Sequence, residues 1–384
     1  MSEFKQGYKQ TKVGIIPEDW EVGGLSKIAN VEMGQSPLGD TYNTERIGVA
    51  LINGPTEFTV RYPIKKQWTS KPTKLCKKGD ILICVRGSST GRINISNDEY
   101  CIGRGVAAIS NKKQKGNIDF IEQILNILSE KILKLTSGST FPNIDKKTLN
   151  EFSIPLPPLK EQEKIAQILT TWDEAITKQT ELLRAKELLK IALMQKLLSG
   201  EVRFNGFNDE WEEVRLGEIC KITTGKLNAN AMVENGQYTF FTCARETYRI
   251  DDFAFDTEAL LVSGNGANVG YIHYFNGKFN AYQRTYVLDG FKHNIFLIKY
   301  LLDKYLSLQI SREKNEGNTP YITLPTLTKM KLKLPSLAEQ QKIAEVLSLA
   351  DDEINLLKNE LEELKQQKKA LMQKLLTGQV RVKV

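Results

Sequence analysis

Residues Leu159–Arg203 read LKEQEKIAQILTTWDEAITKQTELLRAKELLKIALMQKLLSGEVR, and residues Leu337–Arg381 read LAEQQKIAEVLSLADDEINLLKNELEELKQQKKALMQKLLTGQVR. The second block follows the first at a constant spacing of 178 positions, and 21 of the 45 aligned positions are identical. The identities gather at the two ends, in EQ-x-KIA and in ALMQKLL. An internal repeat constrains architecture more strongly than any single motif. The chain is therefore predicted to use one structural unit twice.

Both blocks are predicted to be helices of about 40 residues. A proline-containing segment precedes each block, and a Ser/Thr-Gly pair ends it at 199–200 and 377–378, which are helix start and stop signals. In the second copy apolar residues recur in a heptad pattern that only Lys368 interrupts. These residues are Ile343, Leu347, Ala350, Ile354, Leu357, Leu361, Leu364, Leu371 and Leu375.

The first copy keeps this register less strictly. Polar residues interrupt it at Gln179, Lys186 and Lys190, and we expect Leu182 and Leu189 to take over the buried stripe there. A helix with one apolar stripe has to bury it. The two copies are therefore predicted to pack on each other as an antiparallel pair. A coiled coil between two chains is an alternative that the sequence leaves open.

Length and composition indicate a two-domain protein without a membrane segment. At 384 residues the chain is too long for one core, no apolar run is long enough to span a bilayer, and the N-terminus resembles no signal peptide. The five cysteines form no C-x-x-C pair, so we expect free thiols in a cytoplasmic protein. Residues 1–157 carry 22 Lys+Arg against 16 Asp+Glu, which favours an anionic partner such as nucleic acid.

The segments between the blocks also match each other. Both contain an apolar strand, a glycine-rich turn and a second apolar strand, ILICVRGSSTGRINI and ALLVSGNGANVGYIHYF, and later a helical stretch at 118–135 and 295–310. We predict an α+β fold with two similar, mainly antiparallel domains, separated by two long antiparallel helices that form a coiled coil in a pseudo-two-fold, near-circular arrangement. The matching positions are Trp20, Leu25, Ile28, Gly34, Leu82, Gly87, Gly91 and Ile93 against Trp211, Leu216, Ile219, Gly225, Leu261, Gly266, Gly270 and Ile272.

The predicted boundaries are 1–157 for the first domain, 158–203 for the central helix, 204–335 for the second domain and 336–384 for the distal helix. Because GQVRVKV at the end of the chain matches GEVRF, which leads into the second domain, we expect the N-terminal segment to lie near the C-terminal one.

No motif in the sequence indicates catalysis. Gly264–Gly270 is similar to a dinucleotide loop, but a strand-like YIHYF follows where a phosphate-binding helix is needed. Asn318–Tyr321 is one residue away from the N-P-P-Y of amino-methyltransferases, without a glycine-rich methyl-donor motif upstream. His273 and His293 have no partner at metal-ligand spacing. A standalone nuclease or methyltransferase is therefore the weaker hypothesis.

Taken together, the repeat, the EQ-x-KIA starts, the ALMQKLL-[ST]-G ends and the Trp-x4-Leu-x2-Ile domain starts resemble a type I restriction–modification specificity subunit. GQSP at 34–37 and IPLPPLKEQ at 154–162 strengthen the resemblance, which covers essentially the whole chain.

The resemblance implies a non-catalytic subunit. Each globular segment would be a target-recognition domain that reads one half of a bipartite target in double-stranded DNA, and the helices would set the spacer and bind two methyltransferase subunits. Restriction and translocase subunits would join through the methyltransferase, and the partners, not this chain, would use S-adenosylmethionine, ATP and Mg. A related system with cleavage fused to the methyltransferase and a coiled-coil scaffold that binds no DNA are the alternatives.

Candidate binding residues follow from side-chain chemistry, since Arg can pair with guanine, Asn or Gln with adenine, and Ser or Thr with phosphates or bases. In the first domain they are Lys65, Lys66, Arg86, Ser88, Ser89, Thr90, Arg92 and Arg104. In the second domain they are Lys226, Arg245, Asn265, Asn268, Gln283 and Arg284. For partner binding we select polar residues identical in both repeats, namely Glu161, Gln162, Lys164, Glu339, Gln340 and Lys342.

Overall fold

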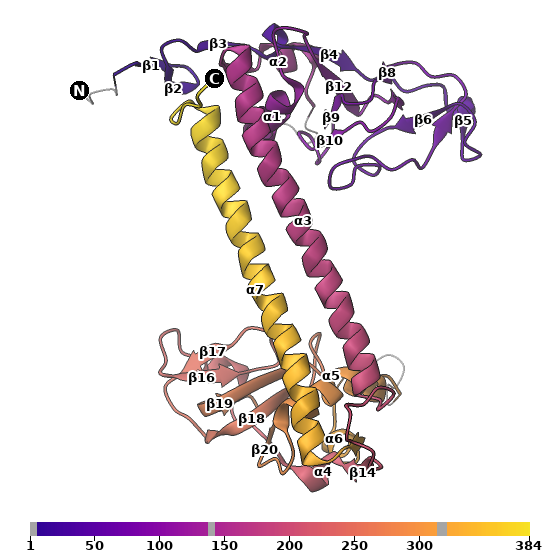
Figure 1. Cartoon of the computed structure of the whole chain (residues 1–384), viewed down its shortest axis with the longest axis vertical. Helices are drawn as coiled ribbons and strands as arrows, with labels where there is room; N and C mark the ends of the chain where they lie inside the picture. Colours follow the sequence, from indigo (N-terminus) through magenta and orange to yellow (C-terminus); the bar gives the residue numbers. More distant parts are fainter. Residues whose placement is uncertain (1–5, 137–142, 313–320) are drawn as a thin grey trace. The chain divides into compact units, whose positions relative to one another are not determined.

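The computed structural model describes residues 6–136, 143–312 and 321–384, which form two compact units (Figure 1). Unit 1 comprises residues 1–180 with 360–384, and unit 2 comprises 181–359. The boundary passes through both long helices, α3 (Leu159–Leu197) and α7 (Leu337–Leu376). Each unit therefore contains one globular domain and half of each long helix, whereas the sequence-based division set the helices apart from the domains.

The globular domain of unit 1 is built on two small sheets. Their strand orders are β10-β9-β12-β4 and β5-β7-β6-β11-β8, and only the β6–β11 pair is parallel. The strands are β4 (Ala29–Met33), β5 (Tyr42–Asn43), β6 (Val49–Ile52), β7 (Trp68–Thr69), β8 (Leu75–Cys76), β9 (Ile81–Cys84), β10 (Ile93–Ile95), β11 (Tyr100–Ile102) and β12 (Val106–Asn111). The helices α1 (Ile118–Thr136) and α2 (Lys146–Glu151) follow.

The globular domain of unit 2 has one six-stranded sheet of order β15-β20-β18-β19-β16-β17, in which only β16 and β19 are parallel. Its elements are α4 (Leu216–Ile219), β15 (Lys221–Thr224), β16 (Tyr238–Phe241), β17 (Tyr248–Ile250), β18 (Phe255–Ser263), β19 (Ile272–Ala281), β20 (Thr285–Asp289), α5 (Ile295–Arg312) and α6 (Leu324–Thr328). The prediction of two mainly antiparallel domains, each with a long helix at its end, is confirmed.

One difference between the two sheets has a local cause. In unit 2 the strand β19 runs without a break past both β18 and β16. In unit 1 residues 96–99 interrupt the corresponding strand, and the Ser96 hydroxyl donates to the Lys77 and Asp98 carbonyls. The interruption separates β10 from β11 and divides the sheet in two.

Short strand pairs connect each domain to its long helices. β3 (Glu21–Gly24) pairs with β13 (Ser153–Leu156) just before α3, and β14 (Glu212–Arg215) pairs with β21 (Lys331–Leu334) just before α7. A further hairpin of β1 (Tyr8–Thr11) and β2 (Gly14–Pro17) lies beside the end of α7, where Tyr8 donates to the Gly378 carbonyl at 2.8 Å (Figure 1). The two ends of the chain thus share unit 1, as predicted.

The two long helices pack against each other in antiparallel fashion within each unit. In unit 1 Lys368 binds Asp173, and Gln179 donates to Glu360 at 2.7 Å. In unit 2 the partners across the helices are Lys190 with Asp351, Lys186 with Glu353 and Lys358 with Glu187. As residue numbers rise along α3, those of the partners on α7 fall. The packing of the two copies within one chain is therefore confirmed.

The prediction for the polar interruptions of the seam was wrong. Leu182 and Leu189 do not replace them in the buried stripe, because their side chains are 43% and 53% exposed. Gln179, Lys186 and Lys190 remain in the seam instead and bind polar residues of α7. A long side chain can bury its methylene stem while its charged head reaches a partner. A lysine in the seam therefore does not force the helix to rotate so that a leucine takes its place.

Each unit holds one buried glutamate at the start of a repeat block. In unit 1 the side chain of Glu161 is 1% exposed and accepts hydrogen bonds from Arg381 at 2.7 and 2.9 Å and from Trp20 Nε1 at 2.9 Å. Arg381 also binds Asp19, and these hydrogen bonds lower the pKa of the Asp19 carboxyl. We call this group, Glu161 with Arg381, Asp19 and Trp20, the first clasp.

The second clasp repeats the acid–arginine pair of the first, but the ring nitrogen of Trp211, the equivalent of Trp20, has no hydrogen-bond partner among the described residues. Glu339 is buried and accepts from Arg203 at 2.7 and 3.0 Å, and Arg203 also donates to the Asp209 carbonyl. In both clasps the acid comes from the start of one block and the arginine from the end of the other. Neither block can therefore complete a clasp alone.

Arg381→Ala is expected to lower the free energy of unfolding by about 2 kcal/mol, because it leaves the carboxylate of Glu161 buried without its charged partner. Urea denaturation followed by circular dichroism measures the loss. Arg184→Ala, at an exposed position of α3, is the control and is expected to change stability by less than about 0.5 kcal/mol. In a Glu161→Gln background Arg381→Ala should cost clearly less; equal costs in both backgrounds would contradict the clasp.

Candidate nucleic-acid interface

The glycine-rich turn of each domain forms a hairpin with the same backbone. In unit 1 it connects β9 to β10, and Gly91 N donates to the Cys84 carbonyl at 2.8 Å. In unit 2 it connects β18 to β19, and Gly270 N donates to the Ser263 carbonyl at 2.8 Å. Gly87 and Gly266 both have φ of 78°, a conformation that side chains disfavour. The prediction of two strand–turn–strand hairpins is confirmed, and the strand β19 confirms that no dinucleotide-type helix follows Gly270.

Two other chain segments meet each hairpin at equivalent positions. Val85 N donates to the Gly105 carbonyl, as Gly264 N does to the Arg284 carbonyl. Isolated antiparallel bridges join Arg86 to Asn143 and Asn265 to Tyr321. The structure thus places hairpin residues beside Arg104 in unit 1 and beside Gln283 and Arg284 in unit 2. We call each three-segment convergence a hairpin site.

In the first hairpin site the side chains of Arg86, Ser88 and Arg104 are exposed and that of Ser89 is half-buried. The prediction that Thr90 binds DNA has to be corrected. Its side chain is 1% exposed and its hydroxyl donates to the Gly87 carbonyl, so it holds the turn and is inaccessible to a ligand. The sequence offered no signal to separate it from the neighbouring serines.

The remaining candidates of the first domain lie around the loop at 55–66. Arg92 donates to the carbonyls of Pro55, Phe58 and Thr59. Lys66 donates to the Thr56 carbonyl, and Lys65 forms an ion pair with Asp98 at 2.6 Å. All three side chains are exposed but bind their own domain. Arg92 thus belongs to the turn through its backbone, whereas its side chain, like those of Lys65 and Lys66, is occupied outside the turn.

The second hairpin site brings together most of its predicted residues, whereas Lys226 lines a hollow beside Phe255 and Asp289. Asn268 donates to the Cys243 carbonyl at 3.1 Å, which attaches the loop of Arg245 to the turn. Gln283 donates to the Asn228 side chain, two residues beyond Lys226. Arg245 stacks on the ring of Tyr271 at 5.4 Å. Lys226, Arg245, Gln283 and Arg284 are exposed, while Asn265 and Asn268 are half-buried.

Sequence reasoning missed two residues of these sites. Asn143 and Tyr321 are exposed and lie directly opposite Arg86 and Asn265, although 57 and 56 positions separate them in the chain. A sequence signal was present, because a proline directly precedes each residue: FPNI contains Asn143, and TPYI contains Tyr321.

The assignment of a partner-binding surface to the EQ positions has to be corrected. Glu161, Gln162, Glu339 and Gln340 are at most 2% exposed. Each glutamine bridges the start of its helix to the loop before α1 or α5: Gln162 binds the backbone of Asn117, and Gln340 that of Asn294. Their identity in both copies therefore reflects internal bonding. Lys164 and Lys342 are exposed and remain candidates.

No cluster of three or more potential metal ligands occurs within 6–136, 143–312 and 321–384, and no helix in that part of the chain has the length and apolar composition to cross a membrane. His273 binds the Ala244 carbonyl, and His293 Nδ1 accepts from the Gln340 side chain. Both histidines thus have structural partners. The hydrogen bond of His293 ties it to the start of α7.

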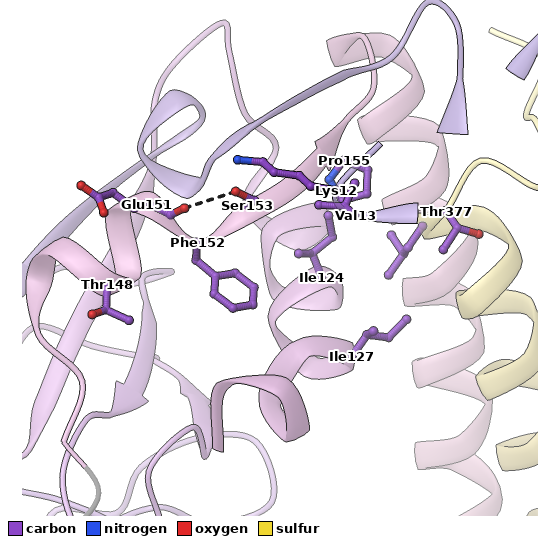
Figure 2. Close-up of a pocket in the computed structure, with 11 residues that line it drawn as sticks. Lys12, Val13, Ile124, Ile127, Thr148, Glu151, Phe152, Ser153, Pro155 and Thr377 are labelled. Atoms are coloured by element: carbon purple, nitrogen blue, oxygen red, sulfur yellow. Dashed lines mark hydrogen bonds between the residues drawn. The ribbon is translucent and has the colours of Figure 1, made fainter. Parts of the chain in front are cut away.

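A separate apolar pocket of about 470 Å³ lies in unit 1. Figure 2 shows Ile124, Ile127 and Phe152 around it, with Ser153 bonded to the Glu151 carbonyl at 3.4 Å. Its polar lining includes Lys12 and Glu151 but no pair of carboxylates and no histidine. The arrangement of the described lining residues does not indicate acid–base chemistry.

The fold and the sites define a protein of duplicated domains, each with one exposed, hydrogen-bonding hairpin site. The family model described as type I restriction modification DNA specificity domain matches residues 17–185 and 208–366. The chain belongs to this family and carries two copies of the domain.

Several known proteins are similar to the chain. The putative type I restriction enzyme MjaX specificity subunit of Methanocaldococcus jannaschii is 40% identical over 52% of this chain and 47% of that protein. The EcoDI specificity subunit of Escherichia coli is 41% identical over 44% of this chain and 37% of that protein. The matches thus span less than half the length of these two relatives. The MjaVIII specificity subunit of M. jannaschii is 27% identical over 99% and 97%.

A solved structure has the same fold over nearly the whole chain. The type I restriction–modification S subunit from M. genitalium matches with a TM-score of 0.68 and 21% identity, covering 96% of this chain and 98% of that one.

Native protein treated with a thiol reagent is expected to react quickly at one cysteine, Cys243, which is the partly exposed thiol beside the second hairpin site. Burial raises the pKa of Cys76 to about 11 and those of Cys84 and Cys220 to about 12, so their reactive thiolates are scarce. Mass spectrometry counts the labels, and Cys243→Ser serves as the control that should react slowly throughout. Rapid labelling of Cys84, which ends β9, would mean that the first hairpin opens in the native protein.

Proposed function

We propose that the chain is the non-catalytic DNA specificity subunit of a type I restriction–modification complex, in which each hairpin site reads one half of a bipartite target. The observation that carries the proposal is the pair of hairpin sites. They share a backbone and its hydrogen bonds but differ in their side chains. Equivalent positions hold Arg86 and Asn265, which favour different bases. Two hairpin sites with the same backbone but different side chains suit a DNA target whose two halves differ in sequence.

The long helices are proposed to set the spacer between the half-sites. α3 and α7 each continue through the boundary between the units, and ion pairs join them on both sides of it. A paired helix resists bending better than a single one, because every bend must also distort the seam. Fixed reader separation makes half-site spacing a geometric property of the protein.

The complex is proposed to include two methyltransferase subunits, with restriction and translocase subunits bound through them, and these partners would use S-adenosylmethionine, ATP and Mg. With the EQ residues buried, we place the docking on exposed residues identical in both blocks. These are Lys164, Ala192, Gln195, Lys196 and Val202 in the first block, with Lys342, Ala370, Gln373, Lys374 and Val380 in the second. Two equal sets suit two equal partners.

Arg86→Ala and Arg284→Ala are expected to act on different halves of the target. The chain is co-expressed with its methyltransferase in a host, and methylated adenines are mapped across the genome. Wild type should give one bipartite sequence. Arg86→Ala should relax only one half-site and Arg284→Ala only the other, each with about tenfold lower discrimination at the affected base. An equal loss on every DNA would identify phosphate contacts, and an unmethylated genome with wild type would contradict the proposed function.

Inserting one heptad into each helix is expected to lengthen the recognised spacer and leave both half-sites unchanged. The insertions follow Thr180 in α3 and Asn359 in α7, at the boundary between the units, so that all pairs within each unit are kept. Seven residues add about 10 Å of helix, or about three base pairs. The same methylation map measures the spacer. A heptad in α3 alone breaks the seam and should abolish methylation, whereas an unchanged spacer in the double insertion would refute this role.

A further inference from the structure

Asn143 and Tyr321 lie in the hairpin sites as the direct partners of predicted reading residues. Arg86 pairs with Asn143 and Asn265 with Tyr321, in isolated antiparallel bridges at equivalent positions of the two domains. Residues opposed in this way present their side chains on the same face. Each hairpin site therefore holds a side-by-side pair that combines one residue of the turn with one from a distant part of the chain.

The hydrogen bonds beside these bridges define their type. Ile144 N donates to the Val85 carbonyl at 2.9 Å, and Ile322 N to the Gly264 carbonyl at 2.7 Å. In both cases the bond joins the residue after one partner to the residue before the other. This is the non-hydrogen-bonded pair of antiparallel geometry, in which opposed side chains come closest.

The backbone of each pair is anchored by buried neighbours. Val85 and Ile144 are at most 1% exposed in unit 1, and Ile322 is 4% exposed in unit 2. Tyr286 further donates its hydroxyl to the Ile322 carbonyl at 2.9 Å. Successive residues of an extended segment face opposite sides, so burial of Ile144 and Ile322 turns Asn143 and Tyr321 outwards.

The exposure of these two side chains has no explanation in the packing of the domains. Tyr321 is 56% exposed, although the backbone of the next residue, Ile322, is bonded to Gly264 and Tyr286. An aromatic ring in solvent, beside Asn265, is suited to contact a base or a thymine methyl group, and its hydroxyl can donate or accept. An Asn side chain in the position of Asn143 can pair with adenine.

We infer that Asn143 and Tyr321 are specificity-determining residues, each completing a two-residue reading unit with Arg86 or Asn265. This rests on the proposed function and adds to it the residues that act together. Opposed side chains are about 4.5 to 5.5 Å apart at their β-carbons, and neighbouring bases are about 3.4 Å apart along the DNA. Both members of a unit therefore read the same or adjacent base pairs.

The test uses the complex with its methyltransferase, on a genome and on a library of DNA with each target position randomised. Asn143→Ala is expected to lower discrimination about tenfold at one base pair, at or next to the one that Arg86→Ala affects, and to leave the other half-site unchanged. Tyr321→Ala should do the same beside the base pair affected by Asn265→Ala. Because the two residues belong to different hairpin sites, Asn143→Ala is the control for the half-site that Tyr321→Ala affects, and Tyr321→Ala is the control for the other. Leu324→Ala, exposed three residues beyond Tyr321, should change neither half-site.

The outcomes separate this inference from the proposed function. Wild type without a bipartite preference overturns both. A bipartite wild type whose preference Asn143→Ala and Tyr321→Ala leave unaltered, or weaken equally on all DNA, overturns the inference alone. A shift at a base pair remote from that of the hairpin partner also overturns it, because the pair would not act as a unit. Tyr321→Phe and Asn143→Ser, with melting temperatures measured for all variants, separate lost contacts from failed folding.

Discussion

The two clasps are the constraint on which the rest of the structure depends. A carboxylate removed from water has to be bound by a charged partner, since leaving it unpaired costs several kcal/mol. Glu161 and Glu339 are buried at the starts of the long helices, and their arginines, Arg381 and Arg203, come from the ends of the opposite blocks. The requirement brings the start of one block to the end of the other within each unit. It explains why the identities of the repeat gather at its two ends.

Ion pairs between the two long helices likewise join one repeat block to the other. Asp173 and Asp351 are identical positions of the two blocks, as are Lys190 and Lys368, and they bind crosswise. Asp173 also accepts from Gln123 of α1, and Asp351 from Tyr300 of α5. One acid thus joins both helices and the domain beside them. The positions that interrupt the apolar pattern are therefore the ones that specify register and direction of the pair.

The sequence predicted elements whose causes are local and missed contacts whose causes are distant. Heptads predicted α7, and glycines predicted the hairpins, because periodicity and backbone freedom act over a few residues. The same reasoning misread Glu161 and Gln162 as a docking surface. Their identity in both copies was compatible with exposure or burial, and the deciding partner of Glu161, Arg381, is 220 positions away. Asn143 was missed for the same reason, since its place beside Arg86 depends on tertiary pairing.

The hairpin sites show how one backbone can carry two specificities. Their anchoring is the same in both domains: the turn closes on the strand before it, and a second segment crosses at Gly105 or Arg284 and a third at Ile144 or Ile322. These bonds involve backbone atoms, which any side chain leaves available. The outward residues differ at equivalent places, with arginine, serine and asparagine in unit 1 and asparagine, glutamine and tyrosine in unit 2. Since backbone atoms supply the bonds that bring the three segments together, replacing the outward side chains can change what is read while the scaffold that presents them is kept.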